Sequence, residues 1–286
     1  MNATMPTDST LQRHLIINAD DFGESQEIND GIVKTHTDGI VTSASLLTNM
    51  EGFEHALTCI QDNPTLDIGI HLNMHRGTPL TDARYLTRDH MFLRNIFLFT
   101  ARVYRSTSRA REEITAEFEA QIQKAIARGV RVSHLDTEKH LHTLPVVFKI
   151  VLTLAKKYSI PTVRLPYEQV SLRMLLNPAQ VYKTAIMFFF APRNRQLLKK
   201  SGLTSTNCFY GVSLSRRFTV LGLKNTIDRL RPGFTEISCH PGYAPQTNLG
   251  YIDTHREAEL ATLTDPKLKD HILKKAIVLS TFFDIR

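Results

Sequence analysis

Acidic and histidine residues recur at the ends of strand-like stretches in this sequence. Asp20 and Asp21 follow an uncharged, largely apolar run at residues 15–19, which is typical of a strand buried on both faces of a parallel sheet. Later strand-like stretches contain or end in further polar residues: His71, His134, Asp136 and His240. Because two adjacent carboxylates repel each other, we expect a cation beside Asp20 and Asp21.

These residue types suit one divalent metal ion, with Zn²⁺ or Mg²⁺ as the expected identity. An ion held by carboxylates and imidazoles, with one position open, lowers the pKa of coordinated water towards ~7 and polarises a carbonyl group. A further carboxylate can accept the proton of the water, and a histidine opposite can protonate a leaving amine. The residues therefore predict metal-assisted hydrolysis of an amide or an ester.

Other interpretations of the same residues are open at this point. Asp21 could be the N-cap of a helix, with Glu24 completing a capping box, and Asp20 could be a solvated loop acid. A phosphoester or glycoside hydrolase on a similar barrel is a second enzymatic interpretation, but a glycosidase needs carboxylates ~5 Å or more apart, which suits an adjacent pair poorly. A non-catalytic sugar- or lipid-binding protein is a third.

Strand-like and helical stretches alternate along the whole chain. We expect strands at residues 15–19, 40–49, 66–73, 130–136, 162–167, 208–214, 233–240 and 277–282. We expect helices at residues 25–38, 52–61, 92–129, 145–158, 223–230 and 256–263, and a loop at residues 74–91.

This alternation predicts an α/β fold, an irregular parallel βα (TIM-like) barrel with seven or eight strands. The barrel forms a single domain over residues 13–286, after a flexible tail at residues 1–12. Such a barrel would bring the polar strand ends together over one mouth. An open doubly wound sheet is the alternative, although the sequence contains neither GxGxxG nor GxxxxGKS/T.

Composition and charge limit the partners of the protein. The formal net charge is +7 and the pI about 9.3, which favours an anionic partner. The chain has no Trp and no recognisable nucleic-acid motif, so we expect no nucleic-acid partner. Three widely spaced cysteines favour a reducing compartment, and the N-terminal residues do not resemble a signal peptide. We therefore expect a cytoplasmic protein.

Six motifs occur in order between residues 13 and 282: HLIINADDFGES, GIVTSASLL, DIGIHLN, SHLDTEKHLH, SCHPGY and REAELATLTDP. In this combination the sequence resembles the YdjC-like carbohydrate deacetylases. The resemblance implies an irregular βα barrel, a divalent metal ion and removal of N-acetyl groups from amino sugars. It also implies Asp20 as general base and Asp21 and His71 as metal ligands. The two aspartate roles rest on analogy with other metal-dependent sugar deacetylases and could be reversed.

One position departs from the family pattern. The family motif resembles HLDxHxHxH, and its first histidine after the aspartate is replaced here by Glu138, followed by Lys139. Glu138 could bind the metal instead, since carboxylates bind the same ions, or His140 could do so. If neither binds it, the chain would be a sugar-binding relative without activity.

Three further residues complete the expected site. His240 is expected to protonate the leaving amine. Arg164 is expected to hold an anionic or hydroxylated part of the substrate, with an ion pair inside the barrel mouth as the alternative. His142 is expected to line the substrate pocket or to cap the following helix.

Two segments combine large apolar residues with several basic ones, at residues 92–111 and 181–200. Neither has an apolar run long enough to span a bilayer, but basic-apolar helices suit an interfacial site on anionic lipid. Ordinary core helices with solvated charges are the alternative. The interfacial interpretation predicts peripheral contact with the inner face of the membrane. It also predicts a lipid-linked amino-sugar substrate, as in the NaxD-like branch that acts on polyprenyl-phosphate-linked N-acetylhexosamines. A homodimer is compatible with the sequence.

Overall fold

The computed structural model describes residues 12–168, 178–211, 214, 218–244 and 254–285. The tail predicted at residues 1–12 lies outside the described residues, apart from Gln12. Within the described parts of the chain, no helix is both long and apolar enough to cross a bilayer.

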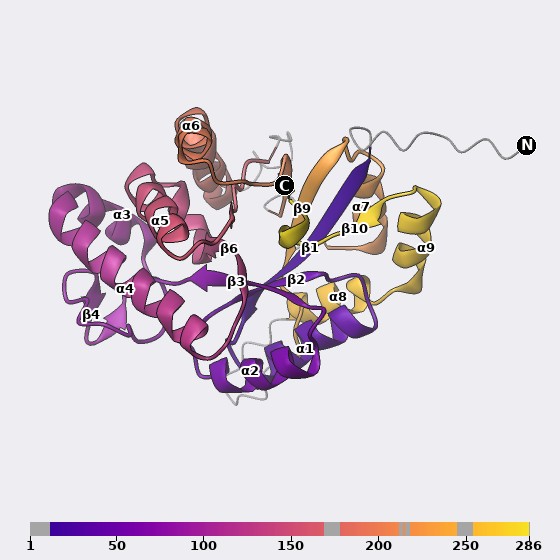
Figure 1. Ribbon diagram of the computed structural model, residues 1–286, viewed down its shortest axis with the longest axis horizontal. Coiled ribbons are helices and arrows are strands. Elements are labelled where there is room, and N and C mark those ends of the chain that lie inside the picture. Colours follow the sequence, from indigo (N-terminus) through magenta and orange to yellow (C-terminus); the bar gives the residue numbers. More distant parts are fainter. Residues whose placement is uncertain (1–11, 169–177, 212–213, 215–217, 245–253, 286) are drawn as a thin grey trace, which may run out of the picture.

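Parallel strands form the central sheet of the molecule (Figure 1). They are β1 (Arg13–Phe22), β2 (Ser43–Leu46), β3 (Asp67–Leu72), β6 (Val132–Thr137), β7 (Thr162–Val163), β8 (Cys208–Tyr210), β9 (Gly233–Cys239) and β10 (Val278–Leu279). Their order is β7-β6-β3-β2-β1-β9-β8, and β10 pairs with the start of β1. Each of these strands lies within, or overlaps, a stretch that the sequence predicted as a strand.

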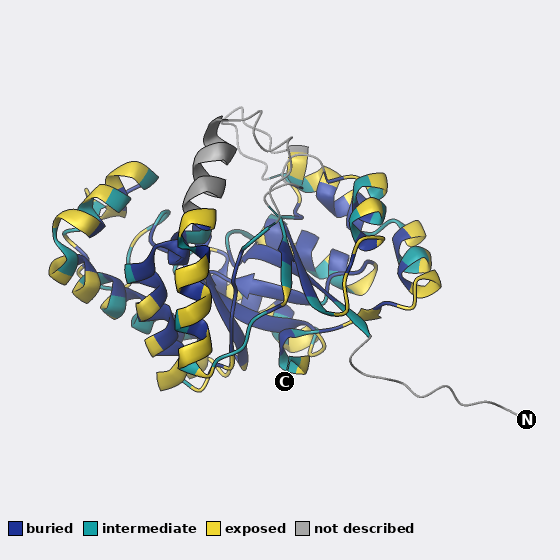
Figure 2. Ribbon diagram, turned by 90° about the horizontal axis from the view of Figure 1, so that it is seen from above, coloured by how far each residue is buried: buried dark blue, intermediate teal, exposed yellow. Residues whose placement is uncertain are grey.

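Helices surround the sheet (Figures 1 and 2). They are α1 (Gln26–Thr37), α2 (Phe53–Asp62), α3 (Ile96–Arg105), α4 (Thr107–Ala127), α5 (Pro145–Lys157), α6 (Pro178–Ser201), α7 (Val220–Ile227), α8 (Thr254–Leu263) and α9 (Pro266–Lys274). Two short 3₁₀ segments, η1 (Glu138–Thr143) and η3 (Phe282–Asp284), follow β6 and β10. Buried residues are concentrated in the sheet and on the inner sides of the helices, as Figure 2 shows.

The sheet is curled rather than flat. Five steps separate β7 from β9 in the strand order, which in a flat sheet would amount to roughly 24 Å. Nevertheless, Arg164, the residue that follows β7, donates from Nε to Oε1 of Glu236 in β9 over 2.6 Å. The described strands β7 and β8 do not pair with each other, so the curl forms a half-barrel. The predicted irregular, TIM-like parallel βα fold is confirmed.

Some predicted boundaries were wrong. The helix expected over residues 92–129 is two helices, α3 and α4, because Ser106 between them has non-helical backbone angles (φ −140°, ψ 80°). The helix α9 was not predicted; Asp265 caps it and Pro266 occupies its first turn. The loop expected at residues 74–91 contains a short antiparallel hairpin, β4 (Thr87–Arg88) with β5 (Met91–Phe92).

Candidate functional site

The turn after β1 separates its two aspartates from the next helix. Asp21 has a left-handed backbone (φ 70°), and Gly23 follows with φ 91°. A Cβ atom on Gly23 would lie 2.5 Å from the carbonyl oxygen of Leu47, so only glycine fits this turn. Ser25, not Asp21, is the N-cap of α1, because its side chain accepts from the N–H of Ile28. The capping interpretation of Asp21 is therefore wrong, and both carboxylates are available for other contacts.

Arg164 is fully buried among three carboxylates from different strands. Its guanidinium donates to Asp20 over 2.7 and 3.0 Å, to Glu236 over 2.6 Å and closely to Asp136. Burial alone would lower the pKa of Arg164, but these carboxylates raise it well above its usual value. Burial raises the pKa of Glu236 to about 7 despite the nearby guanidinium. We call these four residues the Arg164 cluster.

Asp20 has further contacts outside the Arg164 cluster, and these fix its orientation. Asn18 Nδ2 donates to its Oδ1 over 2.7 Å, and the Ser238 hydroxyl donates to its Oδ2 over 3.0 Å. On its other side, His240 Nε2 lies 3.9 Å from Oδ2. The His240 side chain is 42% exposed, whereas Asp20 is only 2% exposed, so His240 lies at the solvent-facing side of the site.

His71, at the end of β3, links the two aspartate groups. Its Nδ1 lies 2.8 Å from Oδ1 of Asp136, and its Nε2 lies 3.8 Å from Oδ1 of Asp21. Burial opposes the charged imidazolium, but the Asp136 carboxylate outweighs it and raises the pKa of His71 to about 9. A carboxylate on Nδ1 fixes the ring so that Nε2 faces Asp21, which is the usual arrangement of a metal-binding histidine.

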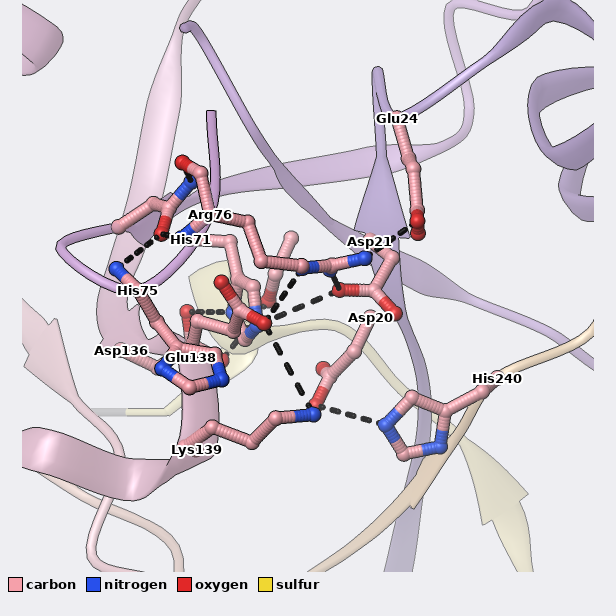
Figure 3. A network of polar contacts seen from close by, with 12 residues as sticks. Asp20, Asp21, Glu24, His71, His75, Arg76, Asp136, Glu138, Lys139 and His240 are labelled. Carbon is pink, nitrogen blue, oxygen red and sulfur yellow. Dashed lines mark hydrogen bonds and ion pairs between the residues drawn. The ribbon is translucent and has the colours of Figure 1, made fainter. Parts of the chain in front are cut away.

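A second group of charges lies beside Asp21 (Figure 3). Arg76 donates from Nη2 to Oδ1 of Asp21 over 2.8 Å, lies with Nε 2.6 Å from Oε1 of Glu138, and contacts Glu24. Arg256 Nη2 donates to Oδ2 of Asp21 over 2.7 Å and to Oε2 of Glu24 over 3.0 Å. We call these five residues the Arg76 cluster. Against the effect of burial, Arg76 and Arg256 hold the pKa of Asp21 well below its usual range.

Glu138 lies at the start of η1, where the chain turns sharply. Lys139 and His140 both have left-handed backbones (φ 55° and 56°). This turn buries the Glu138 carboxylate to 2% exposure and leaves its Oε2 without a hydrogen-bond donor in the part of the chain that the structure describes. A buried carboxylate oxygen without a donor is costly unless a cation compensates it.

Three predicted site residues make contacts within the protein. The His140 ring packs edge-on against Phe209, with ring centroids 5.6 Å apart, and joins no metal-capable group in the described chain. His142 is fully buried, with Nδ1 against the Thr137 hydroxyl at 2.6 Å and Nε2 against the Arg164 carbonyl at 3.0 Å. With both ring nitrogens bonded to protein, His142 has none left for a substrate. Arg164 forms buried ion pairs, as the alternative interpretation of this residue in the sequence predicted.

Two groups in the described residues bring together side chains that could hold a metal ion: Asp20 with His71 and Asp136, and Asp30 with His55 and Cys59. The second group lies on α1 and α2, and its Asp30 is exposed. In the first, Arg164 already bonds both carboxylates, which weakens them as metal ligands.

The opposite side of His71 offers a second set of donors. Its Nε2 faces Asp21 Oδ1, and the Glu138 carboxylate is buried beside the same arginine as Asp21. Imidazole and carboxylate donors together suit Zn²⁺ or a similar ion. By type these donors fit a divalent cation, but in the described chain they are not gathered as closely as the two groups above. Arg76 and Arg256 pair with Asp21, and Arg76 and Lys139 lie beside Glu138.

The sequence did not identify several residues of this site. Arg76, Arg256 and Glu236 received no role, although Arg256 opens the REAELATLTDP motif, and Glu24 was considered only for a capping box. Arg76 lies in a polar loop whose residues carried no periodic signal. Only the fold shows that Arg76 and Arg256, which lie on different elements, converge on Asp21. The adjacent acids after a buried strand were the one available signal, because buried carboxylates require nearby cations. That signal does not say which arginines supply them.

Carboxylates and a histidine at the carboxyl ends of parallel strands lie where βα barrels have their active sites. A model of the YdjC-like protein family matches residues 14–274. The chain belongs to the YdjC-like family.

Relatives of this chain cover nearly its whole length. It is 33% identical over 284 residues to a carbohydrate deacetylase of Brevibacillus brevis, with 95% of this chain and 99% of the relative covered. It is 32% identical over 276 residues to a carbohydrate deacetylase of Geobacillus stearothermophilus, with 95% and 98% covered. A solved structure from Enterococcus faecalis, described as a candidate cellobiose-phosphate cleavage protein, has the same fold. Its TM-score is 0.76 at 23% identity, with 95% of this chain and 98% of that one covered.

Proposed function

We propose that this protein is a metal-dependent carbohydrate deacetylase that hydrolyses the N-acetyl group of an amino sugar. The observation that carries the proposal is the convergence of Asp20, Asp21, His71 and His240 at one edge of the sheet. Their contacts join β1, β3 and the residue after β9. Curated relatives that cover nearly all of this chain are carbohydrate deacetylases, which supports the same reaction.

The ligands in this proposal are Asp21, His71 Nε2 and Glu138. When bound there, a divalent ion supplies a Lewis acid and lowers the pKa of coordinated water. Asp136 keeps the His71 ring turned towards Asp21, and the Arg164 cluster keeps Asp20 in place. His140 is the alternative third ligand, but its ring packs on Phe209.

Proton transfer in this proposal uses Asp20 and His240. Asp20 accepts the proton of the attacking water, and Ser238 and Arg164 orient its carboxylate for this step. His240 donates a proton to the leaving amine, since its partly exposed ring lies where a sugar can approach from solvent. The products are acetate and a free amino sugar.

Acetate release from N-acetylhexosamines by the purified protein tests the proposal. The assay should be paired with the metal content of the same preparation. About one bound divalent ion together with acetate release is expected. Neither metal nor acetate, with the protein folded, would favour a sugar-binding relative, and binding assays would follow.

We further propose that the amino sugar is linked to a lipid phosphate and reaches the site from an anionic membrane surface. The segments that suggested this are α3 and α6. Exposed aromatic and apolar side chains lie on both helices, with Phe188 67% and Phe189 78% exposed on α6, and Phe97 58% exposed on α3. A cavity of about 640 Å³ between α3, α4, α5 and α6 supports the proposal. Its lining includes three cations and no acid: Arg111, Lys149 and Arg193.

Activity on free and lipid-linked N-acetylhexosamines distinguishes the two substrate classes. The double variant Phe188→Ser with Phe189→Ser should lose activity on the lipid-linked substrate, including substrate presented in vesicles. It should retain activity on the free sugar. Leu273→Ser, which changes an equally exposed apolar residue on α9, is the matched control and should behave as wild type. Full activity on free sugars with none on lipid-linked ones would rule out the lipid-linked class.

A further inference from the structure

Arg76 occupies an unusual position for an arginine in a site that suits a metal ion. Its guanidinium contacts three carboxylates at once: Asp21, Glu24 and Glu138 (Figure 3). We propose that Arg76 is a resident counter-cation that competes with the divalent ion, and that the ion enters only when the Arg76 side chain moves out. This inference rests on the metal site of the proposed function and concerns how that site is loaded.

The competition follows from the atoms that Arg76 contacts. Oδ1 of Asp21 accepts from Arg76 Nη2 at 2.8 Å, and the same oxygen faces His71 Nε2 at 3.8 Å. Glu138, on the other side, has its Oε1 2.6 Å from Arg76 Nε. A cation held by Asp21, His71 and Glu138 would need the oxygens that Arg76 now neutralises. A guanidinium that close to a divalent ion would also repel it strongly.

Arg76 can move while the rest of the loop stays in place. Its backbone is fixed, because Asn73 Oδ1 accepts from the N–H groups of His75 and Arg76 and Asn73 Nδ2 donates to the Arg76 carbonyl. The side chain itself is 21% exposed, so a rotation towards solvent is open to it. The movable part is therefore a long side chain and not a segment of backbone.

Charge balance permits such an exchange. When ionised, the three carboxylates of the Arg76 cluster face two guanidinium groups and the ammonium of Lys139, which lies 3.8 Å from Oε1 of Glu138. A divalent ion in place of the Arg76 guanidinium keeps all three carboxylates compensated. Arg256 remains, since it binds the other oxygen of Asp21 and is only 11% exposed.

Arg256 provides a matched control for an experiment. Both arginines pair with Asp21 and Glu24, but Arg76 alone of the two contacts Glu138. Binding of Mn²⁺ should be measured by calorimetry and by water-proton relaxation on the full-length wild-type protein and on the variants Arg76→Gln and Arg256→Gln. Thermal unfolding of each protein establishes that it is folded.

We expect Arg76→Gln to bind Mn²⁺ at least tenfold more tightly than wild type, and the gain for Arg256→Gln to be clearly smaller. The Mn²⁺ affinity of Arg76→Lys, which keeps the charge but loses the planar fork, should lie between those of wild type and Arg76→Gln.

A folded Arg76→Gln protein with unchanged or weaker Mn²⁺ affinity would overturn the inference while leaving the metal site in place. Equal gains for Arg76→Gln and Arg256→Gln would also overturn it, since general electrostatics would then suffice. Absence of Mn²⁺ binding in wild type and in all variants would overturn both the inference and the metal site.

Discussion

Asp20 and Asp21 are adjacent in the sequence but have different surroundings. Asp20 lies in the Arg164 cluster with two neutral donors, whereas Asp21 lies between Arg76 and Arg256 and faces His71. Asp21 also has a left-handed backbone (φ 70°), which marks the end of regular strand geometry at this residue. The difference in surroundings supports separate roles for the two carboxylates, one in proton transfer and one in metal binding.

The variant Asp20→Asn tests this division of roles. Because an amide cannot accept the proton of water, turnover should fall by about a hundredfold or more. The metal content, measured on the same preparation by mass spectrometry, should stay near that of wild type. Loss of the metal in Asp20→Asn would show that the roles of Asp20 and Asp21 are reversed.

We expect Arg164 to position Asp20 and to contribute strongly to stability. Arg164→Met removes one buried charge and leaves Asp20, Asp136 and Glu236 without their shared cation. We expect the free energy of unfolding, measured with urea, to fall by about 3–5 kcal/mol. Arg128→Met, which breaks the exposed ion pair with Glu54, is the control and should leave the urea midpoint nearly unchanged. A similar midpoint for both variants would contradict the importance of the buried cluster.

At the level of elements, the strands were predictable because each carries a short apolar run that the sheet buries. In β1, Leu15, Ile16 and Ile17 are fully buried, and full burial of such a side chain contributes roughly 1.5–3 kcal/mol. The break between α3 and α4 was not predictable, because apolar periodicity continues past Ser106. The positions of Asp20, Asp21 and His71 at the ends of strands were predictable for the same reason.

The turn after β1 yields a test at this scale. Gly23→Ala should lower the free energy of unfolding by more than Gly129→Ala, although both glycines have positive φ (91° and 81°). At Gly129 no atom lies within 4 Å of an added Cβ, so we expect only the backbone cost of about 1 kcal/mol. At Gly23 the added Cβ also meets the Leu47 carbonyl at 2.5 Å. Equal losses in urea unfolding would show that the turn can shift to make room.

For the molecule as a whole, the sequence predicted the irregular, TIM-like βα fold. It did not predict that the sheet stops at a half-barrel, nor the partners of its charges. Alternation of strands and helices defines the fold, since parallel strands need crossover helices. The pairing of Arg164 with Glu236 depends on how far the sheet curls, which no local pattern encodes. The same holds for Arg76, whose partners come from β1, from the turn after it and from η1.

Removal of the metal is a test of the whole molecule. Dialysis against EDTA should abolish acetate release, and added Zn²⁺ or Mg²⁺ should restore it. The circular dichroism spectrum should change little, because the apolar core of the sheet does not depend on the ion. Full activity after chelation, with no metal detected, would exclude metal dependence.

The Arg164 cluster also affects how the protein folds. Arg164 is 144 residues from Asp20 and 72 residues from Glu236 along the chain. Contacts between such distant residues carry a large loop-closure cost and form slowly. During synthesis, Asp20 leaves the ribosome long before Glu236, so the cluster is assembled only after most of the chain has emerged. A site that depends on the Arg164 cluster is therefore complete only at the end of folding. Until β9 has been synthesised, Arg164 can pair with Asp20 and Asp136 but not with Glu236.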